Sequence, residues 1–317
     1  MALQPTRNGR GGNILYDDAV LLSGHQGNVL SAKFSPYGEN IASGGMDRDI
    51  LLWKLPVDLE EEIPNYGILQ GHKGAVTSLR WLSEASLFSV SSDTTVAFWD
   101  TETGVKKRVG KSHSSVVNDC AKLGQQSVSV GDDGDAIVWD EREKNEIFKF
   151  TTEYPLLACD ASKDTIYVSG IDSYVRAYDV KTKKLAWKSQ PFQAPTTSLA
   201  LSHDGNMLAA RSMDGEVRLL STKNIITDGV SRVGKYGYDG SVGGPQKNLV
   251  KLAFSSDDTL LSSGSEEPTC VVWGSTSRRM VHKFDDHAKG VLDVDFHPSE
   301  KILMTASADS NLILREL

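Results

Sequence analysis

Serine, histidine and aspartate occur in this sequence in sets whose residue types could carry nucleophilic catalysis. A hydroxyl activated by an imidazole, which an aspartate in turn orients, is the arrangement of the serine hydrolases. Three such sets stand at His25, Ser43 and Asp47, at His72, Ser89 and Asp93, and at His113, Ser129 and Asp133. A catalytic triad occurs once in an enzyme, whereas this set recurs along the chain. We therefore expect a structural network and no catalytic residues.

The sets belong to an internal repeat. A tryptophan follows each of the three, at Trp53, Trp99 and Trp139. The same register then reaches Tyr178, Leu220, Trp273 and Arg315, with spacings of 46, 40, 39, 42, 53 and 42 residues. A four-stranded propeller blade takes about 40–45 residues. Short apolar and polar alternation without helical periodicity agrees with strands. The repeat predicts an all-β fold of seven units.

Three further positions recur with the closing residue. The acid six residues earlier is Asp47, Asp93, Asp133, Asp172, Asp214, Glu267 or Asp309. The hydroxyl position before it holds Ser43, Ser89, Ser129, Ser169, Ala210, Ser263 or Thr305. The opening position holds His25, His72, His113, Thr152, Phe192, Pro245 or His287. We expect a chain of hydrogen bonds from acid to imidazole to hydroxyl to indole, complete only in the first three units.

This pattern resembles the hydrogen-bonded tetrad of the WD40-repeat family over almost the whole chain. The resemblance implies a seven-bladed β-propeller over residues 13–317, preceded by a flexible tail over residues 1–12. The sequence stops shortly after the third strand of the seventh unit, and an unpaired sheet edge invites aggregation. We therefore expect residues 13–22 to pair with residues 311–316 and close the ring.

Composition and charge exclude several other classes of protein. A net charge of −8 argues against a surface that grips nucleic acid over a broad area. Three separated cysteines suit reduced thiols inside the cell, and no apolar run is long enough for a membrane span. The histidines and cysteines lack the close spacing of a metal site. The run GVKKRVGKS departs from the phosphate-binding loop in its glycine spacing, so we expect no cofactor.

Several surfaces are candidates for partner contact. The residues just before the acids lie at the channel-facing rim and are expected to form a contact surface: Met46, Ser92, Asp132, Ile171, Met213 and Glu266. The basic runs at 106–108 and 181–184 leave open a peripheral contact with RNA or an acidic protein. The acidic run at 60–62 is either a solvated loop or a docking site for a basic partner. The glycine- and tyrosine-containing stretch at 221–248 is either functional or disordered.

Longer stretches carry a narrower resemblance. SSDTTVAFWDTETGVKKR, QKNLVKLAFSSDD and WGSTSRRMVHKF are similar to the family of 40-kDa WD-repeat subunits of the U5 small nuclear ribonucleoprotein. That resemblance implies a non-catalytic scaffold in the nucleus, present as one copy in a large complex, that packs against the large U5 scaffold protein and neighbouring spliceosomal proteins. The alternative is a WD40 adaptor of another complex, such as a ubiquitin-ligase substrate receptor or a chromatin subunit.

The tetrad assignment predicts unequal losses of stability from two substitutions at the same repeat position. His72→Ala should remove a hydrogen-bond partner from a buried hydroxyl and from a carboxylate. We expect this to lower the free energy of unfolding by about 1–3 kcal/mol. Thr152→Ala, in a unit without the histidine, should cost much less. Thermal melts of the two variants would measure the difference, and equal losses would refute the assignment.

Overall fold

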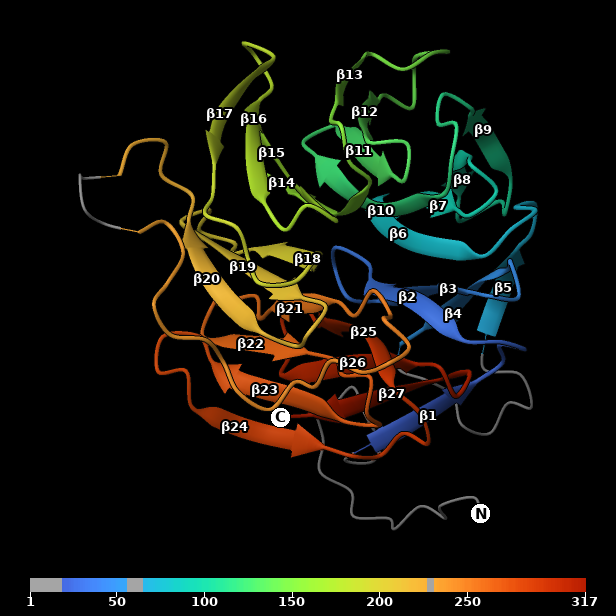
Figure 1. The fold of residues 1–317 in the computed structure, drawn as a ribbon. Helices are drawn as coiled ribbons and strands as arrows, with labels where there is room; N and C mark the ends of the chain where they lie inside the picture. The colour runs from blue at the N-terminus through green and yellow to red at the C-terminus, as the bar shows by residue number, and fades with distance from the viewer. Residues whose placement is uncertain (1–18, 56–64, 227–230) are drawn as a thin grey trace.

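Seven antiparallel sheets stand around a common axis in the computed structural model, which describes residues 19–55, 65–226 and 231–317 (Figure 1). This is the predicted all-β propeller, and each sheet is one blade. Consecutive strands lie side by side within a blade, from an inner strand a at the axis to an outer strand d at the rim. No helix in the described part of the chain could cross a membrane.

The first four blades follow the chain in order. Blade 1 contains β2 (Val29–Phe34), β3 (Asn40–Gly45), β4 (Ile50–Lys54) and β5 (Asn65–Leu69). Blade 2 contains β6 (Val76–Ser83), β7 (Ser86–Ser91), β8 (Val96–Asp100) and β9 (Lys106–Gly110). Blade 3 contains β10 (Val117–Leu123), β11 (Gln126–Gly131), β12 (Asp135–Trp139) and β13 (Phe148–Thr151). Blade 4 contains β14 (Leu156–Ala161), β15 (Thr165–Gly170), β16 (Val175–Asp179) and β17 (Lys184–Lys188).

The last three blades depart from this simple order. Among the described residues, blade 5 has the three strands β18 (Thr196–Leu201), β19 (Met207–Ser212) and β20 (Val217–Ser221). Blade 6 contains β21 (Leu252–Phe254), β22 (Leu260–Ser263), β23 (Cys270–Gly274) and β24 (Met280–Phe284). Blade 7 contains β25 (Val291–Phe296), β26 (Ile302–Ser307) and β27 (Asn311–Glu316), completed by β1 (Ala19–Ser23) from the other end of the sequence.

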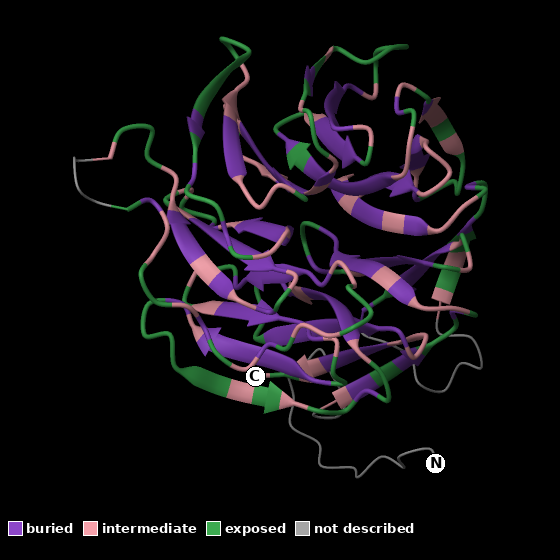
Figure 2. Cartoon of the chain, in the orientation of Figure 1, coloured by how far each residue is buried: buried purple, intermediate pink, exposed green. Residues whose placement is uncertain are grey.

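Burial falls from the middle of each blade to its rim (Figure 2). All six residues of β7 are buried, because the faces of this strand pack on the blades at either side. The outer strand β24 has no buried residue. The apolar clusters accordingly lie between neighbouring blades, and each blade depends on its neighbours for most of its core.

Side chains of the inner strands join successive blades near the axis. The Asp119 carboxylate accepts a hydrogen bond from the Cys159 backbone N–H at 3.1 Å, and the Ser198 hydroxyl accepts one from Leu252 N–H at 2.9 Å. Asp160 accepts from Leu201 N–H at 2.7 Å. An inner strand is next to another blade rather than paired with it, so a side chain must satisfy these N–H groups.

The ring closes as predicted over the described residues. Strand β1 pairs antiparallel with β27, from Ala19 opposite Arg315 to Ser23 opposite Asn311. Residues 13–18 of the predicted closing segment, and the tail at 1–12, lie outside the described residues. Asp293 of blade 7 strengthens the same junction, accepting from Ala32 N–H at 2.9 Å and from the Lys33 ammonium at 2.7 Å. Both charged side chains are buried, so their attraction offsets part of the free energy that each loses on leaving water.

A histidine joins the two blades at the far end of the same junction. His297 Nδ1 accepts from the backbone N–H of Glu300 at 2.9 Å, which leaves the proton on Nε2 for the Gly38 carbonyl at 3.2 Å. Gly38 has a φ of 80° and meets the imidazole so closely that no side chain fits there. Contacts between side chains and backbone therefore hold the first and last blades together in addition to the pairing of β1 with β27.

Blade 5 has a substitute for its missing outer strand. The segment over residues 231–239 (the blade 5 cover segment) runs beside β20 but makes only two isolated bridges, Val217 to Tyr238 and Leu220 to Val233. The Tyr238 side chain is buried, packs on Trp273 with ring centroids 5.5 Å apart and donates its hydroxyl to the Ser275 carbonyl. Disorder was one of the two alternatives for residues 221–248. It is wrong for residues 231–239, which these contacts hold against β20 and Trp273.

The close contact between Gly38 and His297 predicts that one added methyl group at residue 38 strongly lowers the free energy of unfolding. Gly38→Ala adds a Cβ that would lie 2.0 Å from His297 Nε2, besides the left-handed backbone strain of about 1–2 kcal/mol. Gly205→Ala is the matched control, because Gly205 occupies the corresponding turn of blade 5 with a φ of 72° and no described atom within 4 Å of its Cβ. Urea denaturation should show a clearly larger loss of unfolding free energy for Gly38→Ala. Equal losses would contradict the closing role of His297.

Candidate functional site

Blades 1 to 3 contain the hydrogen-bond chain expected from the sequence. In blade 1, His25 Nδ1 lies 2.8 Å from Asp47 and its Nε2 lies 2.8 Å from Ser43 Oγ, which accepts from Trp53 Nε1 at 2.9 Å. Blades 2 and 3 repeat the arrangement with Nε2–Oγ distances of 2.8 Å in the pairs His72–Ser89 and His113–Ser129. Their indoles donate to the same hydroxyls, from Trp99 at 2.7 Å and from Trp139 at 2.8 Å.

These sets are arranged for stability rather than for chemistry. The three serine side chains have no solvent exposure, and each hydroxyl lies between an indole N–H and an imidazole. No substrate can reach such an oxygen. Burial lowers the pKa of His72 although Asp93 opposes the shift. Burial would raise the pKa of Asp93, but hydrogen bonds from Thr95 and Lys73 outweigh it and set the pKa to about 2. No group of metal-ligating side chains occurs in the described part of the chain.

Blade 7 has a partial tetrad. His287 lies 2.9 Å from Asp309 through Nδ1 and 2.8 Å from Thr305 Oγ1 through Nε2. Arg315 stands at the tryptophan position, where its Nε donates to Asp286 at 3.1 Å instead of reaching the hydroxyl. The Thr305 hydroxyl reaches the Ile313 carbonyl at 3.3 Å, so it keeps a second partner without an indole.

In blade 5, apolar side chains occupy three of the four tetrad positions. Phe192, Ala210 and Leu220 occupy the histidine, serine and tryptophan positions and are buried in one cluster. Replacing all partners of a buried polar network by apolar groups leaves no polar atom unsatisfied, so this exchange need cost little stability.

Two assignments made from the sequence were wrong. In blade 4, β15 and β16 place Val168 opposite Arg176, the register that Ser43 has with Leu51, so Val168 and not Ser169 occupies the hydroxyl position. The turns between strands b and c have the same length in blades 1 and 4, and Val168 precedes Asp172 by four residues as Ser43 precedes Asp47, so Ser169 was assigned one residue too late in the sequence. In blade 6, Ser241 rather than Pro245 meets Ser263, at 3.2 Å between the hydroxyls, because the approach to the blade is irregular.

The six residues proposed as a contact surface lie in the turns between strands b and c. These turns and the connections between blades form one side of the disc, which we call the tetrad face. Antiparallel order puts the a–b and c–d turns on the opposite face. On the tetrad face Met46, Asp132 and Ile171 are exposed, whereas Ser92, Met213 and Glu266 are half-buried. Tyr154 lies beside Ile171, whose backbone N–H donates to the Pro155 carbonyl at 3.1 Å.

The chain itself covers the tetrad face at blades 5 and 6. The Glu266 carboxylate accepts from the backbone N–H groups of Gln246 at 3.0 Å and Asn248 at 2.6 Å. The buried Arg211 donates to Ser241 Oγ and to the Val242 carbonyl, each at 3.1 Å. These bonds fix residues 241–248 over the face, so the exposed candidates form a crescent on the remaining blades.

The basic hairpins are largely used within the fold. Lys107 lies 3.2 Å from Asp100 and 3.1 Å from Glu141, and Lys106 donates to the Gly71 carbonyl at 3.0 Å. Lys181 pairs with Asp164 at 2.9 Å, and the Lys183 ammonium lies over the Phe148 ring. The acidic run at 60–62 lies outside the described residues.

An ion pair missed from the sequence crosses the axis of the ring. Lys251 of blade 6 reaches Asp119 of blade 3, with 2.9 Å between Nζ and Oδ2 and both side chains almost fully buried. Burial would raise the pKa of Asp119, but Lys251 and Arg80 outweigh it and lower the pKa. Charged residues on inner strands of an all-β repeat are the signal that could have found this pair. At the axis, Lys251 and Asp119 neutralise each other.

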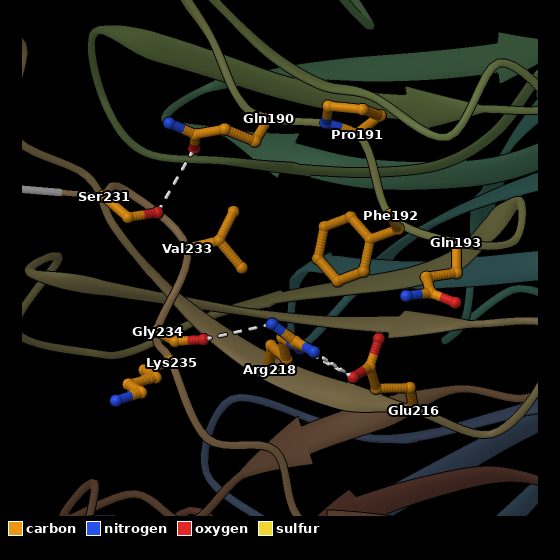
Figure 3. Close-up of a pocket in the computed structure, with 10 residues that line it drawn as sticks. All are labelled: Gln190, Pro191, Phe192, Gln193, Glu216, Arg218, Ser231, Val233, Gly234 and Lys235. Carbon is orange, nitrogen blue, oxygen red and sulfur yellow. Dashed lines mark hydrogen bonds and ion pairs between the residues drawn. The ribbon is translucent and has the colours of Figure 1, made fainter.

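A pocket of about 630 Å³ lies where blade 5 lacks its outer strand (Figure 3). One wall is the connection from blade 4, with Gln190, Pro191 and Phe192, and the other is the cover segment, with Val233 and Lys235. Arg218 lies between them, bonded to Glu216 and, at 3.5 Å, to the Gly234 carbonyl. The pocket is therefore apolar at Phe192 and Val233 and polar at its edge.

Comparison with known proteins identifies relatives over nearly the full length. The family model "WD domain, G-beta repeat" matches residues 19–54, 64–100, 238–274 and 278–315. Pre-mRNA-splicing factor cwf17 of Schizosaccharomyces pombe is 35% identical over 93% of this chain and 86% of its own. The U5 small nuclear ribonucleoprotein 40 kDa protein is 38% identical in Homo sapiens and 30% in Dictyostelium discoideum, each over 83% of its length and over 94% and 93% of this chain.

The tetrads predict a pH-dependent effect of one substitution. Because the pKa of His72 is lower in the fold than in the unfolded chain, the unfolded state takes up its proton first as the pH falls through about 6.5. His72 therefore stabilises the fold most at pH 8 and less at pH 5.5. Denaturant titrations of the wild type and His72→Ala should show a smaller difference in unfolding free energy at pH 5.5. A larger difference there would mean that an imidazolium paired with Asp93 is the stabilising form.

Proposed function

Because this chain belongs to the WD40-repeat family of the U5 small nuclear ribonucleoprotein 40 kDa protein and of splicing factor cwf17, we propose that it is a non-catalytic U5 subunit acting in pre-mRNA splicing in the nucleus. The observation that carries this proposal is identity of 35–38% with these splicing proteins across more than nine-tenths of the chain. WD40 repeats alone would support only a general role in protein contacts.

The structure suits a scaffold in three ways. Its buried serine–histidine sets are inaccessible to substrate, and Lys251 is paired with Asp119 across the axis. The blades share their cores, so the disc presents its loops in a fixed relative arrangement. A rigid surface binds a partner with little loss of conformational entropy.

The crescent on the tetrad face is the proposed contact for the large U5 scaffold protein and its neighbours. Met46 and Ile171 there are 55% and 51% exposed. Large apolar side chains that stand free in solution and become buried against a partner are typical centres of binding energy. Ser92 and Asp132 would contribute the surrounding polar contacts, whereas Met213 lies beside the covering loop at Gly243 and Glu266 positions the loop at 244–248.

Affinity purification of the tagged full-length protein from nuclear extract tests the function. We expect mass spectrometry to recover U5 proteins, including the large scaffold, together with U5 small nuclear RNA. Depletion of the protein should also raise the ratio of unspliced to spliced transcripts. Recovery of cullins or chromatin subunits in place of U5 proteins would overturn the splicing role and favour the adaptor alternative.

The contact surface is tested by charges introduced at its two large exposed apolar residues. The double variant Met46→Asp/Ile171→Asp should lose at least about tenfold of the recovered U5 scaffold, because an unpaired charge would be buried at the interface. Tyr37→Asp is the control, since Tyr37 is 75% exposed in an a–b turn of the opposite face. Unchanged melting temperatures would exclude unfolding. Loss confined to Tyr37→Asp would place the partner on the other face.

A further inference from the structure

The side of blades 5 and 6 carries an exposed aromatic ring between two cations. Tyr236 of the cover segment is 61% exposed, although the neighbouring Tyr238 is buried. The Lys235 ammonium lies 5.4 Å and the Arg278 guanidinium 5.7 Å from the centroid of the Tyr236 ring. Arg278 belongs to the c–d turn of blade 6, and the exposed Arg279 follows it. We call Lys235, Tyr236, Arg278 and Arg279 the Tyr236 platform.

The charges of this platform are available to a partner. Lys235, Arg278 and Arg279 form no ion pair with any described carboxylate. This distinguishes them from Lys107 and Lys181 of the basic hairpins, which are paired within the fold. Although the chain has a net charge of −8, two unpaired cations lie at one exposed ring, and the exposed Arg279 follows one of them in sequence.

The pocket at blade 5 continues the platform. Lys235 lines this pocket and also lies at the Tyr236 ring, so one cation separates a flat aromatic surface from a hollow of about 630 Å³. The Gln190 and Gln193 side chains at the pocket carry amide groups that can both donate and accept hydrogen bonds (Figure 3). An aromatic surface, a cation and a recess with amides therefore follow one another along the surface.

We propose that the Tyr236 platform binds single-stranded RNA. A nucleobase would stack on Tyr236, Lys235 and Arg278 would contact the phosphates on either side, and the next base would enter the pocket beside the Gln190 and Gln193 amides. Aromatic stacking combined with a cationic track is the general means of binding single strands. An acidic peptide would satisfy the cations but has no flat group for the exposed ring. This inference goes beyond the proposed scaffold role and does not depend on it.

Fluorescence anisotropy with a labelled 12-nucleotide oligouridine and the purified full-length protein tests the platform at low salt. Tyr236→Ala should weaken binding by at least about fivefold, as loss of one stacked base does. Tyr37→Ala, which removes an exposed tyrosine from the a–b turn of blade 1, away from the platform, should leave binding unchanged. The Tyr236 side chain is exposed, so both variants should keep the wild-type melting temperature.

Charge and salt provide the second readout. Arg278→Gln should lower the slope of log affinity against log salt by about 0.7 if it removes one phosphate contact. Arg279→Glu should weaken binding more than Lys181→Glu, which makes the same change in net charge at another blade. No binding by the wild type at 100 mM salt, or equal losses in the Tyr236 and Tyr37 variants, would overturn the proposal. Equal competition by polyglutamate would also overturn it and indicate an acidic protein partner.

Discussion

Closure of the ring is the constraint on which the rest of this structure depends. Each blade buries its apolar residues against its neighbours, so an open ring would expose two faces at once. Pairing of β1 with β27 completes the last sheet, and Asp293 and His297 join the first and last blades at two further levels. The two ends of the chain thus supply one blade, and no sheet edge is left at the junction.

Within the closed ring the blades are stabilised by different means. Blades 1 to 3 use a buried polar chain and blade 5 uses an apolar cluster at the same positions, as at Phe192 and Leu220. The imidazole, hydroxyl and indole groups of the polar chain are paired, and the apolar cluster has no side-chain polar atom at the same positions, so the architecture is kept while the outside of the blade changes. Blade 5 exchanges its outer strand for an irregular segment, and this creates the pocket and exposes Tyr236. The pocket and the exposed Tyr236 therefore lie where the repeat of this chain is least regular.

The repeat period, read from the sequence, predicted the number of blades and the tetrads of the first three. These features are local, because the acid, hydroxyl and indole of a tetrad lie on adjacent strands of a single hairpin unit. Closure was predictable for a similar reason, since an incomplete last sheet requires a strand and the residues before Gly24 have strand-forming composition. Prediction became less accurate where the approach to a blade is irregular, as in blade 6, where Ser241 and not Pro245 meets Ser263. In blade 4 the assignment was one residue off, because Val168 and not Ser169 has the spacing to Asp172 that Ser43 has to Asp47.

Only the tertiary structure decided how groups from different blades meet. The pair of Lys251 with Asp119 crosses the axis between blades that are far apart in the sequence. The same holds for Glu266, which bonds a loop of its own chain, and for the basic hairpins, whose charges are mostly paired. The sequence by itself determined what each blade contains, because the repeat encodes contacts within a blade. Which charges and rings remain free for a partner depends on long-range packing, and no periodicity encodes that.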